Sequence, residues 1–160
     1  TEVVGESPYF VLTGEGAEAP FRQPAGDLEV VREALYDCMW ADVGILRTAE
    51  SLQRGLRKLD ALDAQLSRTG VATIDRAFHM GWHDWLNLKN LVAVSRVITL
   101  SALAREDSRG AHFREDFPDA GDLEHSHTIV VRQRGGELDL KREPVRFTRV
   151  APGQSLLAPA

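Results

Sequence analysis

The spacing of apolar residues predicts three long helices. The first begins after Asp27, whose carboxylate can cap a helix, and ends near Gly44. The second follows Thr48 and carries one apolar stripe on an otherwise charged surface, so we expect it to be half exposed. The third runs from residue 84 or 85 to about residue 105. Its apolar residues fall on nearly every side of the helical wheel, which predicts a helix enclosed by neighbours.

The connections between these helices favour a bundle. Residues 44–47 are too few for a long crossover, which favours antiparallel neighbours, and Gly70 marks the turn out of the second helix. Residues 71–84 hold apolar side chains without a clean period, and we expect a short helix there. The predicted fold class is therefore mainly α, an antiparallel three-helix bundle like a spectrin repeat, over residues 27–118.

The two ends of the chain follow other patterns. Residues 1–26 are rich in glycine and proline, so we expect a linker or extended arm. Within residues 119–160, the β-branched run 128–131, the pair Gly135–Gly136 and the alternating residues 137–141 predict a small β-hairpin, with a third extended segment after it. We expect this hairpin and the C-terminal tail to pack on the bundle.

Composition limits the class of protein. The 160 residues are 43% hydrophobic, which suits one domain with a core, and polar residues interrupt every apolar run before it reaches membrane-spanning length. We therefore expect no direct membrane insertion. With 19 basic and 24 acidic residues and no basic run, nucleic acid is not an expected partner. The single cysteine, Cys38, is expected to be buried, and the start at Thr1 suggests a fragment or processed piece.

A dense block of charge follows the third predicted helix and carries a resemblance. The stretch SRGAHFREDFP at Ser108–Pro118, preceded by ALARED, closely resembles a segment in the C-terminal helical domain of the succinate dehydrogenase and fumarate reductase flavoproteins and the related L-aspartate oxidases. MWADVGILRTAESLQRGL at Met39–Leu56 resembles the first helical hairpin of that domain, and PVRFTRVAPGQSLL at Pro144–Leu157 resembles its tail. The resemblance covers roughly residues 27–157.

The resemblance implies a supporting domain of a flavoenzyme. FAD would belong to the full-length protein and would not be bound by this chain, which has no Gly-rich dinucleotide-binding turn after a strand. The implied partners are the FAD-binding and capping domains and an iron-sulfur subunit, in the cytoplasm or peripherally on the inner face of the membrane. The isolated chain could also form a homodimer. The tail favours the dehydrogenase and reductase over the oxidase, whereas the short connection from Leu66 to Trp85 argues against a membrane-bound respiratory complex.

The residues expected to form the site lie in the charged block. The arginines can pair with nearby acids and with the last carbonyls of the third helix, which favours a structural polar network or domain interface over catalysis. Arg109 and His112 could alternatively act on a dicarboxylate or a proton. The candidates are Arg105, Glu106, Ser108, Arg109, Gly110, His112, Arg114 and Asp116.

Two further interpretations were weighed against this one. His79 and His83 have the spacing of a metal-ligand pair, but no acidic motif accompanies them, so a surface or capping role is favoured. The chain could also be a free-standing helical adaptor that binds proteins through residues 53–63 and the N-terminal arm. An adaptor should be a monomer without affinity for a flavin-binding domain.

Overall fold

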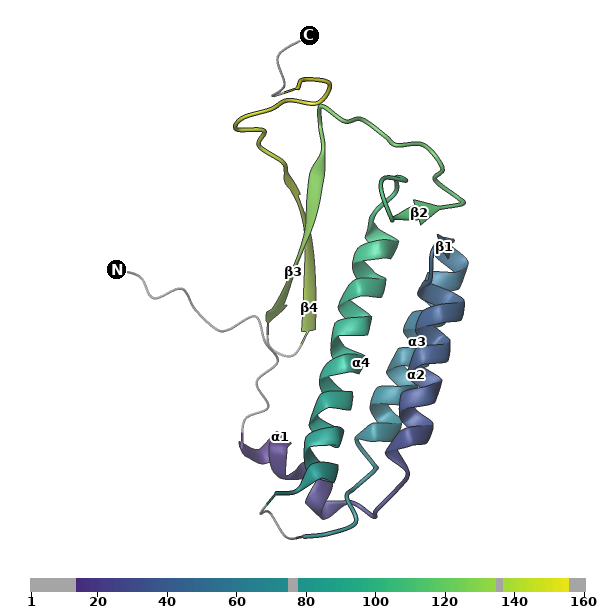
Figure 1. Ribbon diagram of the computed structural model, residues 1–160, viewed down its shortest axis with the longest axis vertical. Coiled ribbons are helices and arrows are strands. Elements are labelled where there is room, and N and C mark those ends of the chain that lie inside the picture. Colours follow the sequence, from purple (N-terminus) through teal and green to yellow (C-terminus); the bar gives the residue numbers. More distant parts are fainter. Residues whose placement is uncertain (1–13, 75–77, 135–136, 156–160) are drawn as a thin grey trace, which may run out of the picture.

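The computed structural model describes residues 14–74, 78–134 and 137–155, and over these residues the protein is mainly α-helical, as expected. Three long helices lie side by side: α2 (Leu28–Val43), α3 (Ala49–Leu66) and α4 (Met80–Ala104). Figure 1 shows that α2 and α4 run in one direction and α3 returns between them. The C-terminal ends of α2 and α4 therefore meet the N-terminal end of α3 at one end of the molecule.

Local capping explains where α2 and α3 begin. The carboxylate of Asp27 accepts a hydrogen bond from the Glu29 amide at 2.9 Å, which satisfies one free N–H of the first turn of α2. Thr48 and Ser51 exchange backbone and side-chain hydrogen bonds at the start of α3, forming a reciprocal capping box. Both starts fall where the sequence predicted them.

The hydrophobic core lies between the three long helices. It continues into the turn after α3, because the indole N–H of Trp85 on α4 donates to the carbonyls of Leu66 (3.1 Å) and Thr69 (2.8 Å). Because the buried indole N–H has two acceptors, its burial carries little free-energy penalty. The two hydrogen bonds also fix the position of α4 relative to the end of α3. The buried core residues are Val31, Leu35, Cys38, Leu59, Leu62, Leu66, Trp85, Leu88 and Val92.

The described part of the N-terminal arm differs from the extended structure that the sequence predicted. Gly14–Glu18 forms a short helix, α1, and Ala19–Arg22 forms a turn of 3₁₀ helix, η1. The indole N–H of Trp82 donates to the carbonyl of Ala17 at 2.8 Å, which holds α1 against the start of α4. The helical conformation of residues 14–22 is therefore favoured by a tertiary contact with α4, which no local sequence pattern indicates.

The start of α4 also differs from the prediction. The helix begins at Met80, and no separate short helix precedes it in the described residues between α3 and α4. His79 is the reason, because its Nδ1 accepts a hydrogen bond from the Trp82 amide at 2.9 Å and its Nε2 contacts Thr73. The histidine thus caps the helix in the role usually filled by Ser, Thr, Asp or Asn.

By length and composition, α4 is the single helix among the described residues that could cross a membrane. Core helices of water-soluble folds meet the same test, and one side of α4 contributes Trp85, Leu88 and Val92 to the core. Its two basic residues bind α3, with Lys89 2.7 Å from Asp63 and Arg96 3.4 Å from Asp60, and Asp84 lies 3.2 Å from Arg32 of α2.

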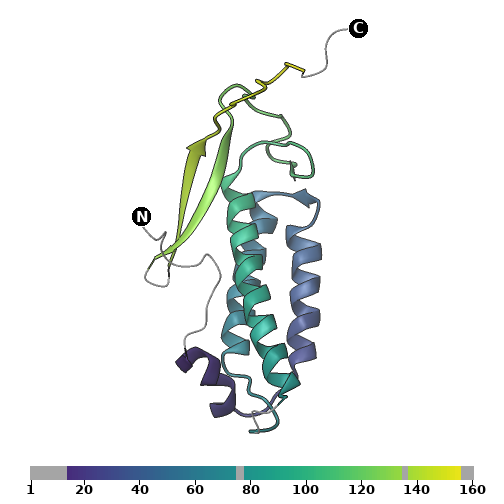
Figure 2. The same cartoon turned by 60° about the vertical axis from the view of Figure 1, so that its left-hand side comes forward.

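Two small sheets complete the fold. Strand β1 (Leu46–Arg47) pairs in parallel with β2 (Phe113–Arg114), and β3 (His127–Arg134) pairs antiparallel with β4 (Glu137–Pro144). The β3–β4 hairpin agrees with the prediction, although its turn lies outside the described residues. No third strand follows it in the described residues up to 155, contrary to the expected third extended segment. Figures 1 and 2 show the hairpin alongside α4, on the side away from α2.

Candidate functional site

The charged block of the sequence forms a corner at the end of α4. It covers residues 105–126, between α4 and β3, and it includes strand β2. Figure 1 shows this corner above the ends of all three long helices. We refer to residues 105–126 as the corner.

Arg114 is the buried centre of the corner. Its side chain is 1% exposed, and its Nη1 donates to the carbonyls of Ala102 (3.0 Å), Leu103 (3.1 Å) and Arg105 (3.0 Å). The last carbonyls of a helix have no partner within the helix and carry partial negative charge. Arg114 of strand β2 therefore caps the C-terminal end of α4 with its guanidinium.

Asp116 connects Arg114 to α3. Its carboxylate binds the guanidinium of Arg114 at 2.7 and 2.8 Å, and its Oδ2 accepts from the Ala49 amide at 2.8 Å, at the start of α3. The hydrogen bonds from Arg114 lower the pKa of Asp116 to about 2, against the opposing effect of partial burial. The guanidinium carbon of Arg114 lies over the Phe117 ring, 4.9 Å from the centroid of the ring. One buried arginine thus joins the ends of two helices.

Arg109 organises the loop that follows β2. Its guanidinium donates to the carbonyls of Ala120 and Asp122 and to the Ser126 hydroxyl at 2.7 Å. The Asp107 carboxylate lies 3.3 Å from the Arg109 guanidinium and 2.7 Å from that of Arg105. These interactions fix the path from the corner to β3.

The remaining corner residues close the turn. Ser108 accepts the Arg114 amide at 2.8 Å, and its hydroxyl donates to the Phe117 carbonyl at 2.8 Å. Gly110 has φ 56°, a backbone conformation that favours glycine, in a tight turn. Glu106 forms an ion pair with Arg142 of β4 at 3.5 Å.

His112 pairs with Arg47, a residue that the sequence analysis did not select. The Arg47 Nη1 lies 2.8 Å from the His112 Nδ1, and the Arg47 Nε donates to the Val43 carbonyl at 3.0 Å. Arginine can only donate, so the His112 Nδ1 must accept and the imidazole must be neutral. Burial, followed by the positive charges of Arg105 and Arg47, lowers the pKa of His112. Arg47 also caps the C-terminal end of α2, as Arg114 caps that of α4.

A second ionic cluster, also missed from the sequence, lies between α2 and α3. Asp42 is 2% exposed and binds the Arg54 Nε at 2.7 Å and the Lys58 Nζ at 2.6 Å. Burial acts to raise the pKa of Asp42, but the hydrogen bonds from Lys58 and Arg54 outweigh it and lower the pKa. The spacing of Arg54 and Lys58 on one helical face was the available signal, but no local pattern identifies their partner on α2.

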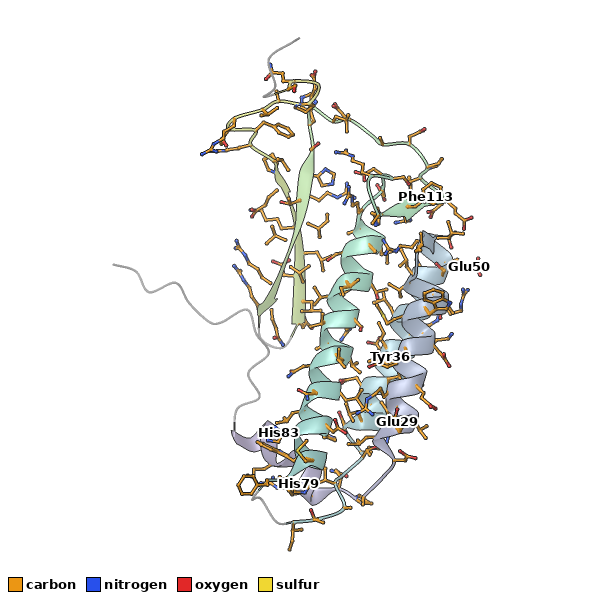
Figure 3. All side chains as sticks on the ribbon, viewed as in Figure 1. Glu29, Tyr36, Glu50, His79, His83 and Phe113 are labelled. Carbon is orange, nitrogen blue, oxygen red and sulfur yellow. The ribbon has the colours of Figure 1, made fainter. Side chains whose placement is uncertain are left out.

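The histidine pair weighed as a metal site lies at the other end of the three long helices. Figure 3 shows His79 and His83 near the start of α4, far from the corner. Both ring nitrogens of His79 are engaged in the cap. The residues that the structure describes contain no group of three His, Cys, Asp or Glu side chains placed to hold a metal ion.

The geometry of the corner defines a structural class of site. Its arginines bind carbonyls and carboxylates of the chain itself, in forked arrangements that fix the backbone. The site joins the ends of α3 and α4 to the hairpin, so it acts as a junction between elements of the chain.

Comparison with known proteins identifies the family. Residues 32–156 match the family described as fumarate reductase flavoprotein C-term. The chain therefore belongs to this family of flavoprotein C-terminal domains. The matched region includes the whole corner and the three long helices apart from the first residues of α2.

Relatives and solved structures agree with this assignment. The chain is 32% identical over 126 residues to a fumarate reductase flavoprotein subunit of Mycobacterium tuberculosis, covering 78% of this chain and 21% of that protein. It is 34% identical over 130 residues to L-aspartate oxidase 1 of Ralstonia nicotianae, covering 72% and 23%. A quinol-fumarate reductase structure with menaquinol molecules matches with a TM-score of 0.74 at 26% identity, over 82% of this chain and 23% of that one. The apo Sdh1 complex of Mycobacterium smegmatis matches with a TM-score of 0.71 at 26% identity, over 83% and 23%. The chain spans about a fifth of the length of the curated relatives it matches.

Proposed function

We propose that the chain supports the flavin-binding and capping domains of an FAD-dependent flavoprotein of the succinate dehydrogenase and fumarate reductase type, and that it does not catalyse alone. The observation that carries this proposal is the corner, whose sequence resembles that of the family and whose Arg114 is fully committed to holding the chain's own helix ends. An arginine used in this way is not available to bind a substrate.

The domain arrangement follows from the same proposal. We treat α2, α3 and α4 as one rigid antiparallel three-helix bundle of the spectrin-repeat kind. Residues 1–26 serve as the linker of this bundle. The hairpin and tail in residues 119–160 pack on the side of the bundle that faces away from α2. A bundle held at its helix ends by Arg114 and Arg47 offers a stiff platform, which is what a domain that positions another domain requires.

The cofactor and partners are proposed from the names of relatives and from the resemblance of the corner sequence to the family. The matched proteins include an FAD-dependent oxidoreductase, a fumarate reductase flavoprotein subunit, and structures of a quinol-fumarate reductase and of an Sdh1 complex. We propose from the resemblance that the full-length protein carries FAD, contacts an iron-sulfur subunit, and lies in the cytoplasm or peripherally at the inner face of the membrane.

A chimera tests this function. The C-terminal domain of the Mycobacterium tuberculosis flavoprotein subunit is replaced by this chain, and flavin retention after gel filtration and fumarate reduction are measured. We expect the chimera to keep its flavin, a version that lacks the domain to lose it, and the isolated chain to bind none. Stoichiometric flavin in the isolated chain would contradict the supporting role, and so would a truncated version that retains flavin and activity.

The oxidase remains the second candidate because the Ralstonia relative is an L-aspartate oxidase at 34% identity. A matching chimera with that protein separates the two. Support for L-aspartate oxidation with none for fumarate reduction would favour the oxidase. A chain that supports neither, and that stays monomeric with no affinity for a flavin-binding domain, would instead favour the free-standing adaptor.

A further inference from the structure

Residues 14–26 form a strap that crosses the three long helices at the end away from the corner. The strap comprises α1, η1 and the residues up to the start of α2. Figures 1 and 2 both show α1 beside the start of α4 on the hairpin side, whereas α2 begins on the opposite side of α4. The chain therefore reaches the three helices on the hairpin side and crosses to α2 through the strap.

Backbone contacts lock the strap to the turn that follows α3. The Gly70 amide donates to the Pro24 carbonyl at 2.7 Å. The Val71 amide donates to the Pro20 carbonyl at 3.2 Å. A Cβ atom on Gly70 would lie 2.1 Å from the Gln23 carbonyl oxygen, which is closer than real Cβ contacts come. The close approach of these two segments therefore requires glycine at position 70.

Trp82 on α4 holds the strap from the other side. Its indole N–H donates to the Ala17 carbonyl at 2.8 Å. The Phe21 ring of the strap stacks on the Trp82 ring at a centroid distance of 6.5 Å, and it meets the His79 ring edge-on at 5.5 Å. Pro20 of the strap is fully buried. Because polar and apolar anchors act together, the strap is held in one position, unlike a flexible linker that samples many end-to-end distances.

We propose that Gly70 and Trp82 are positioning residues of the full-length flavoprotein, which hold the strap so that the preceding domains join the three helices on the hairpin side of α4. This inference rests on the proposed function, in which the chain is the C-terminal part of the protein and follows the flavin-binding and capping domains. A locked strap lets the preceding domains sample fewer positions relative to the helices. It therefore raises the effective concentration of the helices at those domains.

The strap can be displaced without disturbing the main core, where Ala19 is the one described strap residue that packs against the core cluster. Gly70→Ala adds a single methyl group that should push the strap away. In the 160-residue chain we expect the Val71 amide to exchange with solvent about tenfold faster, the size of one lost hydrogen bond, with an unchanged far-UV circular dichroism spectrum. Gly26→Ala is the matched control, because its methyl group would meet only the Thr69 side chain, at 2.8 Å, and a side chain can shift.

The chimera with the Mycobacterium tuberculosis flavoprotein subunit measures the positioning role. We expect Gly70→Ala and Trp82→Ala each to speed the loss of flavin about tenfold relative to the chimera with the unchanged chain. Trp82→Phe keeps a ring for Phe21 to stack on but loses the N–H that binds Ala17, so it should recover part of the effect. Gly26→Ala should leave the rate of flavin loss unchanged.

The outcomes separate this proposal from the proposed function. If the unchanged chimera keeps its flavin and the Gly70→Ala and Trp82→Ala chimeras keep it equally well, the role of the strap is overturned and the supporting function stands. An unchanged chimera that loses its flavin would overturn both. Faster flavin loss that is accompanied by a lower urea midpoint of the isolated variant chain would also overturn the positioning role, because the two residues would then act through the stability of the helices.

Discussion

Arg114 and Asp116 form a forked ion pair, with Nε–Oδ1 at 2.7 Å and Nη2–Oδ2 at 2.8 Å, and the same guanidinium caps the end of α4. Removing the arginine leaves three carbonyls at the end of α4 short of a buried donor, whereas the Asp116 carboxylate is 30% exposed and can be hydrated. We expect Arg114→Ala to lower the free energy of unfolding by about 2–3 kcal/mol, chiefly for the lost hydrogen bonds to these carbonyls. Urea denaturation of the chain, followed by far-UV circular dichroism, measures this value.

Arg114→Lys tests whether the forked shape of the guanidinium matters in addition to its positive charge. An ammonium group cannot reach the carbonyls and both carboxylate oxygens together, so we expect it to restore less than half of the loss. Arg109→Ala is the matched control, because this side chain is more exposed and holds the loop after β2 instead of a helix end. We expect it to cost about 1 kcal/mol. If Arg109→Ala lowered the free energy of unfolding more than Arg114→Ala does, the loop after β2, and not the cap on α4, would contribute more to stability.

The parts of this fold that local chemistry determines were predictable from sequence. Asp27 and Thr48 mark the starts of α2 and α3 because a cap acts within three residues of its own position. The start of α4 was missed although a surface or capping role was favoured for His79, because histidine is not a residue that usually marks a helix start and its cap also needs a contact with Thr73.

The site was predictable as a block but not as a set of contacts. The density of charge in residues 105–116 indicated a polar network, and each arginine had several acids within reach. The sequence could not tell that Arg114 would be buried while Arg109 holds the loop, because that choice depends on the path of the chain after α4. Arg47 and His112 are 65 positions apart in the sequence, and only the pairing of β1 with β2 brings them together.

The low pKa of Asp116 predicts resistance to mild acid. A carboxylate whose folded pKa is about 2, below its unfolded value of about 3.9, contributes stability that is present above the unfolded pKa and is lost as pH falls through the folded pKa. We therefore expect Asp116→Asn to lower stability at neutral pH and to flatten its decline in strong acid. Urea midpoints across the acid range measure both effects, and parallel curves for the two proteins would contradict the assignment.

The neutral state of His112 predicts a separate loss of stability at weakly acidic pH. Its folded pKa lies below the unfolded value of about 6.5, so the unfolded chain takes up a proton first as pH falls. Arg47 and Arg105 oppose protonation, and Asp107 only partly offsets them. Stability should thus decline as pH falls below about 6.5. His112→Asn keeps an acceptor for Arg47 without a titrating group, and a decline that persists unchanged in this variant would show that another histidine is responsible.

The buried cluster at Asp42 predicts an asymmetry between its members. Asp42 is 2% exposed, whereas the side chains of Arg54 and Lys58 are 44% and 51% exposed and can return to water when the acid is removed. We expect Asp42→Ala to cost about 1–2 kcal/mol, chiefly for lost hydrogen bonds. The double variant Arg54→Ala with Lys58→Ala leaves a buried carboxylate without a partner, and we expect it to cost more, about 3 kcal/mol or above.

Adding Asp42→Ala to that double variant provides the decisive comparison. If an unpaired buried charge causes the loss, removal of Asp42 should restore part of the stability, although it deletes a third polar residue. The contribution of Asp42 to the pH dependence should also change sign. In the native protein its pKa is lowered, so its contribution is present above the unfolded pKa of about 3.9 and is lost in stronger acid. In the double variant burial should raise that pKa, so the difference in stability between the double and the triple variant should grow as pH rises from about 4 toward neutrality. Additive losses in the triple variant would mean that the carboxylate reaches water when its cations are gone.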